Sequence, residues 1–223
     1  MTASESFLAG LEREDRAELE KQWLVRKYGR DETIIGHDQP GRDVFFVLEG
    51  RARATVYSAN GKMVAYRDIE PGGIFGELAA IDGKARSASV VALDSLSVAC
   101  LPAKAFRTLV DTRPGFTWTL LVHMSDQIRR MTERVYEFST LVVRKRLIRE
   151  LLRLAGDRDR EGAVGSIFPA PTHFELATKI STHREAVSRE MSELAKRGLV
   201  MRRGKRLLLP DPAALEALAH AEH

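Results

Sequence analysis

The sequence is poor in cysteine and has no long apolar run. Its 223 residues include one cysteine, Cys100, which excludes an intrachain disulfide, a zinc site of several thiolates and a cysteine-ligated iron–sulfur cluster. The longest stretch without Asp, Glu, Lys or Arg is Gly162–Phe174, 13 residues with two prolines, whereas a membrane-spanning helix needs about 20 apolar residues. The N-terminus lacks a basic segment followed by an apolar core, so no signal peptide is expected. These absences predict a soluble cytoplasmic protein with no membrane partner.

Motifs of catalysis and of metal binding are missing as well. The chain contains no nucleophile elbow and no phosphate-binding P-loop. Its histidines, at positions 37, 123, 173, 183, 220 and 223, have no metal-ligand spacing. Cys100 lies in an apolar, strand-like run, which favours a buried structural thiol over a reactive one. We therefore expect neither an enzyme nor a metal site.

Positive charge gathers in the C-terminal third of the chain. Residues 142–223 carry 16 Lys/Arg and 11 Asp/Glu, a net charge of +5, while residues 1–141 carry 19 and 20, a net charge of −1. A basic region of this kind favours an anionic partner such as nucleic acid. An ordinary solvated surface is the alternative interpretation of the same charge.

The N-terminal half shows two patterns. The first 30 residues predict an amphipathic helix, with apolar residues among dense charges at Leu8, Leu11, Leu19 and Leu24. From Thr33 onward, short β-prone runs are separated by glycines; these runs are Val44–Leu48, Ala52–Tyr57, Met63–Tyr66, Ser89–Ala92 and Ser97–Leu101. Asn60-Gly61 predicts a hairpin turn between two of them, because both residues tolerate positive φ. Short strands at this spacing predict a β-sandwich or a β-roll.

A long helix is predicted after the strands. Pro102–Asp111 resembles a short helix, and Pro114 is suited to open a longer one. Apolar residues then recur at alternating spacings of three and four, at Leu121, Met124, Ile128, Met131, Val135, Phe138 and Val142. This a/d seam of about three heptads, flanked by charged residues, predicts a parallel coiled-coil dimer. A helix packed on the core of its own domain is the alternative.

The C-terminal third predicts a winged helix-turn-helix. After a basic helix over Arg144–Leu154, Thr172–Glu175 is a capping box for a short helix whose inward residues are Leu176, Ala177 and Ile180. Thr182–Glu185 resembles a second capping box, for a helix that ends near Lys196 and buries Val187, Met191 and Leu194. Two runs around the Gly204-Lys205 turn would form a two-stranded wing, at Leu199–Arg202 and Leu207–Leu209. A plain helical hairpin is the alternative.

The second helix of this pair is the predicted recognition helix. Its first turns carry four polar residues that can project to one side, Arg184, Glu185, Ser188 and Arg189. Arginine can donate two hydrogen bonds to guanine, glutamate can accept one from cytosine, and serine can do either. Glu185 has a competing role, because a capping glutamate faces its own backbone. Surface charges without a target are the alternative for all four.

A second candidate site lies among the predicted strands. Phe75–Ile81 predicts one helical turn after a strand, and a loop then leads to Arg86-Ser87-Ala88. A helix N-terminus offers free N–H groups to an anion, and an arginine adds two charge-assisted donors to phosphate oxygens. Glu77 would repel phosphate but can accept hydrogen bonds from a ribose hydroxyl. Together these residues predict a pocket for a phosphate ester joined to a sugar; a structural ion pair between Arg86 and Glu77 is the alternative.

These two sites carry a family resemblance. FGELAAIDGKARSAS resembles the phosphate-binding cassette of cyclic-nucleotide-binding domains. THREAVSRE resembles the recognition helix of the cyclic AMP receptor protein, whose wider family includes the fumarate–nitrate reduction regulator. The resemblance implies an α+β fold in three parts. These are a cyclic-nucleotide-binding β-roll with an N-terminal helix over residues 1–112, a long coiled-coil dimerisation helix over 113–142 and a winged helix-turn-helix DNA-binding domain over 143–223.

The resemblance also implies roles for individual residues in the nucleotide pocket. Backbone groups of Gly76 and Leu78 would contact the ligand, and Glu77 would meet the ribose 2′-hydroxyl. Arg86 would hold the cyclic phosphate, with Ser87 and Ala88 beside it. In the family, adjacent hydroxyl residues of the long helix contact adenine; these positions fall on Met131 and Thr132 here, which leaves both cyclic AMP and cyclic GMP open as the ligand.

On the DNA side, the resemblance assigns a reading surface. Arg184, Glu185 and Arg189 match the triad that reads a TGTGA half-site, and Ser188 matches the serine that the other branch of the family uses. Thr172, in the first helix of the pair, is also expected to contact DNA. Ser181 stands where the family has a turn glycine, so a slightly different turn is expected.

The function that follows is transcription regulation. We expect a homodimer that binds palindromic double-stranded DNA in response to cyclic AMP or cyclic GMP and that contacts RNA polymerase. One alternative is a regulator of the same fold with a vestigial pocket, either independent of ligand or responsive to haem or redox signals. Another is a nucleotide-binding module that acts on a protein partner, for which DNA binding would be absent.

Overall fold

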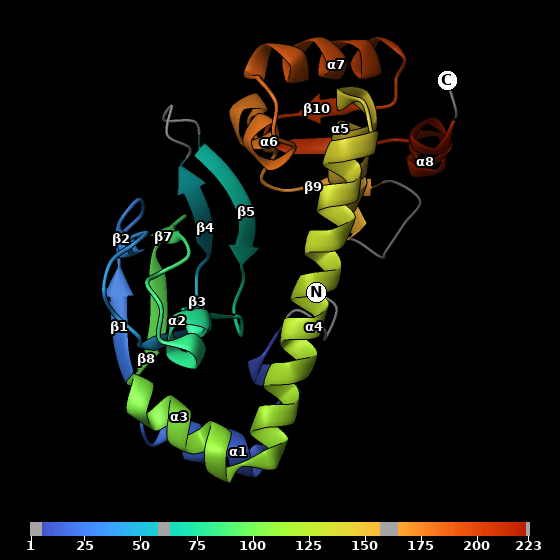
Figure 1. Cartoon of the computed structure of the whole chain (residues 1–223). Helices are drawn as coiled ribbons and strands as arrows, with labels where there is room; N and C mark the ends of the chain where they lie inside the picture. Colours follow the sequence, from blue (N-terminus) through green and yellow to red (C-terminus); the bar gives the residue numbers. More distant parts are fainter. Residues whose placement is uncertain (1–5, 58–62, 157–164, 222–223) are drawn as a thin grey trace. The chain divides into compact units, whose positions relative to one another are not determined.

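The computed structural model describes residues 6–57, 63–156 and 165–221. The chain divides into two compact units, residues 2–129 and residues 130–223, which we call the N-terminal and the C-terminal unit. Helix α4 (Pro114–Thr140) begins in the first unit and ends in the second (Figure 1). Of the described helices, none is long and apolar enough to cross a membrane.

The N-terminal unit contains a β-roll, as predicted. Two antiparallel four-stranded sheets have the orders β1-β8-β3-β6 and β2-β7-β4-β5. Their strands are β1 (Leu24–Tyr28), β2 (Thr33–Ile35), β3 (Val44–Glu49), β4 (Ala52–Tyr57), β5 (Met63–Ile69), β6 (Ile74–Phe75), β7 (Ser89–Ala92) and β8 (Leu96–Leu101). Strands β4 and β5 pair antiparallel, as the hairpin prediction requires, although the turn at Asn60-Gly61 lies outside the described residues.

The prediction of one amphipathic helix over the first 30 residues is wrong. The segment contains the short helices η1 (Leu8–Gly10) and α1 (Arg13–Glu20), and then strand β1, which pairs with β8. Leu24 follows Leu19 by five residues, and this spacing places the two side chains on different faces of a helix. As an edge strand, β1 leaves Leu24 66% exposed. Two further helices complete the unit, α2 (Glu77–Asp82) and α3 (Ala103–Thr112).

Strand β3 is buried on both faces and joins the two apolar cores of this unit. Val44 and Phe46 pack in a cluster with the first helices and the start of α4, where the Phe46 ring lies 5.7 Å from that of Phe7. Phe45 and Val47 face the interior of the β-roll, and Phe45 stacks on Phe75 at 5.1 Å. Burial on both faces explains why this strand is a continuous apolar run and shows no alternation.

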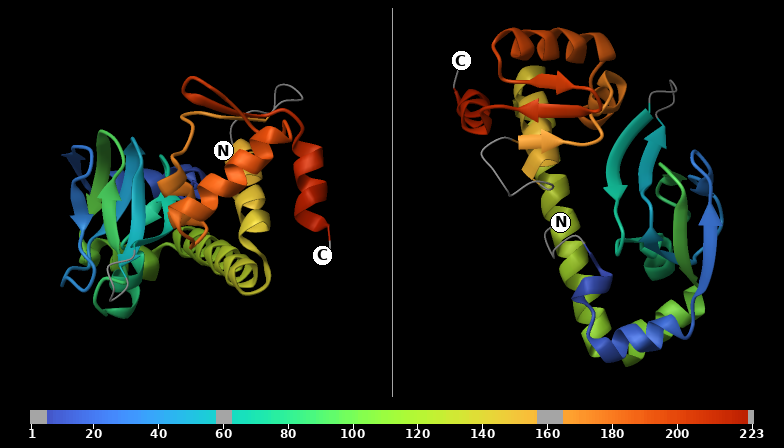
Figure 2. Two further views of the ribbon diagram at one scale, coloured as in Figure 1. Left: turned by 90° about the horizontal axis from the view of Figure 1, so that it is seen from above. Right: turned by 180° about the vertical axis from the view of Figure 1, so that it is seen from behind.

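The C-terminal unit is a winged helix-turn-helix. After α5 (Val143–Gly156), the helix pair consists of α6 (His173–Lys179) and α7 (Arg184–Lys196). Strands β10 (Met201–Arg203) and β11 (Arg206–Leu209) form the wing, and β9 (Gly165–Ile167) adds a third strand next to β11 (Figure 2). Helix α8 (Pro212–His220) follows. The predicted inward residues of both helices are buried.

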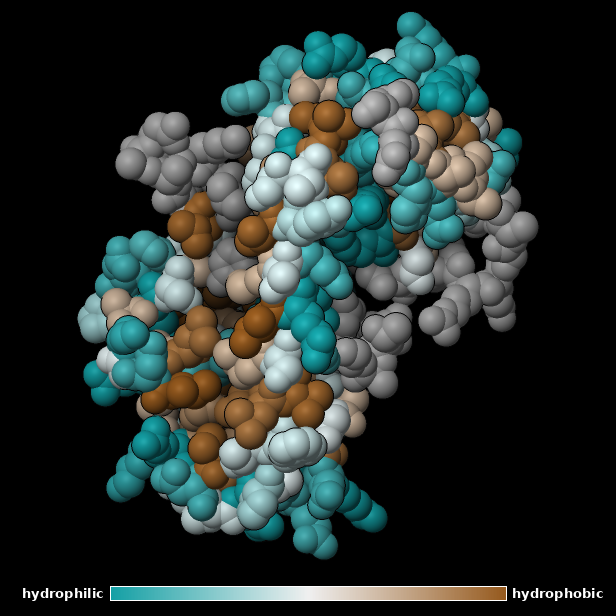
Figure 3. All heavy atoms as spheres, turned by 45° about the vertical axis from the view of Figure 1, so that its right-hand side comes forward, coloured by the Kyte–Doolittle hydropathy of each residue, from teal (hydrophilic) through white to brown (hydrophobic). Residues whose placement is uncertain are grey.

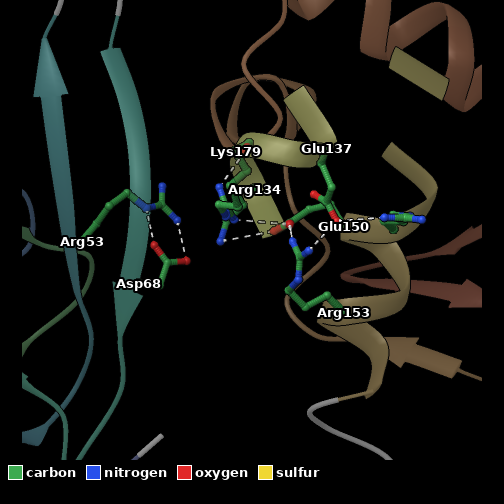
Figure 4. A network of polar contacts seen from close by, with 8 residues as sticks. Arg53, Asp68, Arg134, Glu137, Glu150, Arg153 and Lys179 are labelled. Atoms are coloured by element: carbon green, nitrogen blue, oxygen red, sulfur yellow. Dashed lines mark hydrogen bonds and ion pairs between the residues drawn. The ribbon is translucent and has the colours of Figure 1, made fainter. Parts of the chain in front are cut away.

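A cluster of ion pairs joins α4, α5 and α6 within this unit (Figure 4). Glu150 of α5 is 3% exposed and pairs with Arg134 of α4 at 3.5 Å, with Lys179 of α6 at 3.7 Å and with Arg153. Arg153 also pairs with Glu137 of α4 at 3.1 Å. The Arg134 guanidinium donates a further hydrogen bond to the carbonyl of Lys179, at the C-terminal end of α6. One arginine of the long helix therefore caps the first helix of the helix-turn-helix.

Candidate functional site

The predicted nucleotide pocket is built around a sharp corner between β6 and α2. Gly76 at this corner has φ +83°, a left-handed conformation that favours glycine. A Cβ atom there would lie 2.7 Å from Arg86 Nη1 and 2.9 Å from the carbonyl oxygen of Asp43. Both the backbone conformation and the close approach therefore require glycine at this position.

Arg86 is held by backbone carbonyls. It is 6% exposed; its Nη1 donates to the carbonyl of Gly76 and its Nη2 to that of Asp43, each at 2.8 Å. Its guanidinium also lies 6.0 Å above the Phe45 ring. The alternative of an Arg86–Glu77 ion pair is wrong, because within the described residues no such pair is formed. Two of the five guanidinium N–H groups are used in this way, which leaves three for an anion.

The electrostatics of this corner suit a negatively charged ligand. Burial lowers the pKa of the Arg86 guanidinium, and the nearby carboxylates of Asp43 and Glu77 oppose that shift. An arginine nevertheless keeps its charge at neutral pH. A cation taken out of water in this way is stabilised when an anion binds to it.

Glu77 is the second polar side chain of the pocket. It is 6% exposed and is the first residue of α2. A carboxylate accepts hydrogen bonds, and the hydroxyls of a sugar are able to donate them. Of its predicted neighbours, Ala88 is buried, whereas Leu78 and Ser87 are exposed.

Asp43 is a residue of this site that the sequence did not indicate. Besides its carbonyl bond with Arg86, its carboxylate accepts a weak hydrogen bond from Cys100 Sγ at 3.8 Å and one from the Ala103 amide at 3.4 Å. Cys100 is 4% exposed, which confirms the prediction of a buried thiol, and burial raises its pKa. Asp43 precedes Arg86 by 43 residues, so no local sequence signal links them.

Met131 and Thr132 lie in the C-terminal unit, on the exposed side of α4. The six other predicted ligand residues lie in the N-terminal unit. Contact of Met131 and Thr132 with a nucleotide base therefore stays a prediction.

The predicted DNA-reading residues share one surface of α7. Arg184, Glu185 and Arg189 are exposed, while the opposite face of the helix is buried. The prediction of a capping box at Thr182 is wrong. The N-cap is His183, and no side chain in the described part of the chain caps the helix there. Glu185 is therefore not held against its own backbone, and its side chain is exposed.

The first helix of the pair begins as predicted. The Thr172 hydroxyl accepts a hydrogen bond from the Glu175 amide at 3.1 Å, and the Glu175 carboxylate accepts one from the Thr172 amide at 2.7 Å. The same hydroxyl donates to Glu175 Oε2 at 2.9 Å. Both groups of Thr172 thus serve the cap, and its expected contact with DNA stays a prediction.

The turn between α6 and α7 is strained at Ser181. This residue has φ +51°, a left-handed conformation that most side chains disfavour. The backbone bond from Thr182 N to the Ala177 carbonyl, 2.9 Å long, closes the turn. The position that the resemblance assigns to glycine therefore has a glycine-like backbone, although its residue is serine.

The wing adds basic side chains to the same unit. Residues 201–206 are all exposed and include Arg202, Arg203, Lys205 and Arg206. Arg206 also lies 5.0 Å above the ring of Phe168. An exposed basic hairpin next to a recognition helix is suited to contact the DNA backbone.

The predicted seam of α4 is largely exposed in the single chain. Leu121, Ile128, Met131, Val135 and Val142 have exposed fractions between 49% and 65%, while Met124 and Phe138 are half-buried. Figure 3 shows apolar side chains in brown on the face of the molecule where α4 runs. The helix ends at Thr140, before the predicted end at 142. A regular stripe of exposed apolar residues indicates a surface that a partner covers.

Comparison with known proteins matches both units. A model of the cyclic nucleotide-binding domain matches residues 25–113, and a model of the Crp-like helix-turn-helix domain matches residues 145–218. The chain is 24% identical to a CRP-like cAMP-activated global transcriptional regulator of Mycobacterium tuberculosis over 96% of both chains. It is 29% identical to the transcriptional regulator LdrP of Thermus thermophilus, over 86% of this chain and 95% of that one.

Solved structures show the same fold. The crystal structure of a CRP-family transcriptional regulator from Thermus thermophilus has a TM-score of 0.71 and 28% sequence identity. The match covers 88% of this chain and 97% of that chain. The order of the elements, from the β-roll through the long helix to the winged helix-turn-helix, is therefore shared with proteins of known structure.

Proposed function

The chain belongs to the family of the cyclic AMP receptor protein and the fumarate–nitrate reduction regulator, and on this premise we propose that it is a homodimeric transcription regulator switched by a cyclic nucleotide. The observation that carries the proposal is the corner at Gly76. There a buried arginine, with three N–H groups beyond its two bonds to backbone carbonyls, and a buried glutamate lie beside a position that requires glycine. One cation for a phosphate and one carboxylate for sugar hydroxyls match a cyclic nucleotide.

DNA binding is the proposed output. Arg184 and Arg189 are free to donate to guanine, and Glu185 is free to accept from cytosine, because no helix cap holds it. The relatives are transcription regulators, which supports regulation of transcription. The proposal places this activity in the cytoplasm and adds RNA polymerase as a further partner. In the DNA-competent dimer, two recognition helices about 34 Å apart would read a palindromic site.

The exposed seam supports a second copy of the chain as the dimer partner. Two parallel helices with this spacing bury their a and d residues against each other. A dimer also supplies the twofold symmetry that a palindromic site requires. In such a dimer a ligand acts by binding one arrangement of the two chains more tightly than the other.

Arg86→Leu tests the proposal. We expect it to weaken cyclic AMP or cyclic GMP binding more than tenfold, because a charge-assisted bidentate contact is lost, worth about 1.5–3 kcal/mol. Calorimetric titration with each nucleotide measures the loss. DNA binding measured by fluorescence anisotropy should lose its nucleotide response but keep a weak, salt-sensitive component.

Arg42→Leu is the matched control. Arg42 is exposed, and its Nη2 donates to the carbonyl of Gly83 at 2.8 Å in the neighbouring loop, so the variant loses the same charge nearby. It should bind nucleotide within about threefold of the wild type, because exposed charges contribute little. Equal losses of nucleotide affinity in both variants would show that Arg86 acts only through its positive charge near the site and not through direct contact with the phosphate. Wild-type protein that binds neither nucleotide would contradict the proposed ligand class.

A further inference from the structure

His173, a residue without an assigned role, contacts the DNA-reading helix. It is the first residue of α6, directly after the Thr172 cap, and it is half-buried. Its Nδ1 lies 2.7 Å from the hydroxyl oxygen of Ser188 on α7. Ser188 is half-buried on the side of α7 that also carries Arg184 and Arg189. The imidazole thus fixes one hydroxyl of the proposed reading surface.

The surroundings of His173 favour its neutral form. Burial, and then the positive charges of Arg184 on α7 and Arg202 on β10, lower the pKa of the imidazole below its ordinary value of 6.5. On α6 itself, the nearest carboxylate is that of Glu175, which serves the helix cap. At neutral pH the ring therefore carries one proton, and it gains a second one only in acid.

The protonation of the ring decides what Ser188 can offer to a base. A neutral ring with a bare Nδ1 accepts the serine proton, so that the hydroxyl has only acceptor lone pairs left. A protonated ring donates through Nδ1, and the serine O–H is then free to donate. An acceptor suits the amino groups of cytosine and adenine, whereas a donor suits guanine O6 and N7 or thymine O4.

We propose that His173 is a positioning residue for DNA reading, which orients the Ser188 hydroxyl and selects whether it presents an acceptor or a donor to the base it faces. The inference rests on the proposed function, because it needs α7 to lie in the major groove. It adds a residue of α6 to those that set sequence preference. It also makes that preference depend on pH.

The experiment measures base preference rather than affinity alone. A palindromic duplex is first selected from a random library with the wild-type protein in the presence and in the absence of cyclic AMP. Duplexes with each base substitution in both half-sites are then titrated in steps from about pH 8 down to about pH 4.5, because the acidic end must lie below the lowered pKa of His173. The wild type should shift its preference at one position toward a base with acceptor groups, by about two- to tenfold, the range of one hydrogen bond.

Three variants separate positioning from other roles. His173→Phe keeps a ring without nitrogens and should lose both the neutral-pH preference at that position and its pH shift. His173→Asn keeps a side-chain donor and acceptor near the position of Nδ1 but does not titrate, so it should retain a preference and lose the shift. Ser188→Ala should match His173→Phe, and adding His173→Phe to it should change the preference no further. His183→Asn, at the exposed N-cap of α7, is the control and should keep the shift.

Other outcomes would overturn the inference. If His173→Phe keeps the wild-type preference while its melting temperature is unchanged, the contact with Ser188 has no part in reading. If the effect of His173→Phe is equally large in the Ser188→Ala background, His173 contacts DNA itself and does not act through the serine. Wild-type protein that selects no palindrome would contradict the proposed function, and the inference would fall with it.

Discussion

Removing the charge of Glu150 tests whether the ion-pair cluster holds α4, α5 and α6 together. The Glu150 carboxylate is the common partner of Arg134, Arg153 and Lys179, and its side chain is 3% exposed. Glu150→Gln preserves the size of the side chain but leaves three cations without their shared anion. The C-terminal unit should therefore become less stable.

The magnitude follows from how buried each partner is. Breaking a buried ion pair costs about 3–5 kcal/mol when the remaining charge cannot reach water. The Arg153 side chain is 39% exposed and that of Arg134 21%, so water would partly stabilise both, whereas Lys179 is 12% exposed. We expect a loss of about 2–4 kcal/mol in the free energy of unfolding. For a unit of this size, the melting temperature should fall by at least about 8 °C.

Differential scanning calorimetry of wild type and variant measures this loss. Glu133→Gln is the control, because Glu133 lies on the exposed side of α4 and the same chemical change there should shift the melting temperature by no more than about 2 °C. If the Glu150→Gln protein has the same melting temperature as the Glu133→Gln protein, the reasoning is refuted. The cluster would then stabilise the unit no more than an ordinary surface charge does.

Three further predictions concern the dimer, the turn and the reading surface. Ile128→Lys should give a monomeric or misfolded protein in sedimentation, because two like charges would be buried face to face across the seam. Their desolvation and their repulsion should each cost several kcal/mol, and a stable dimer would rule out the seam as the interface. Ser181→Gly should raise the free energy of unfolding by about 0.5–1 kcal/mol in urea titration, because it relieves the left-handed conformation at φ +51°; a decrease would show that serine is not strained there. Arg184→Ala and Arg189→Ala should each lose about 1–3 kcal/mol on the selected palindrome and less on scrambled DNA; equal losses on both would assign these arginines to phosphate contacts.

Local sequence signals predicted most of the elements because the physics behind them is local. The Thr172–Glu175 capping box forms as its spacing predicts, and the short β-prone runs between glycines correspond to β3, β4, β5, β7 and β8 of the β-roll. Helix α8 was missed although a signal was present: the Asp211 side chain caps it, accepting from the Ala214 amide at 2.9 Å, and Pro212 is its first residue. Strand β1 was missed because tertiary pairing with β8 overrides a charged, helix-like composition.

The candidate sites were predictable in their motifs but not in their contacts. The residues around Gly76 and Arg86 are recognisable in sequence, yet the Asp43 carbonyl that holds Arg86 depends on how the sheets pack. Likewise, nothing local predicts that His173 reaches Ser188 fifteen positions along the chain. Spacing alone could not decide whether Glu185 caps its helix or reads DNA, because Thr182 and His183 both precede Glu185 by one helical turn or less and either could be the N-cap. In the structure the N-cap is His183.

Helix α4 carries two different surfaces, an exposed apolar seam and an inward side that contacts α6. Its 27 residues span about 40 Å as one continuous helix. Val135 of the seam is 65% exposed, while the adjacent Arg134 is turned inward and donates to the last turn of α6. Residues that are neighbours on a helix move together, so a change of packing at the seam would displace Arg134 as well. Because Arg134 caps the helix that precedes the recognition helix, a rearrangement of the two α4 helices in the proposed dimer would be transmitted to α6 through this contact. This path requires no contact between the ligand and α6.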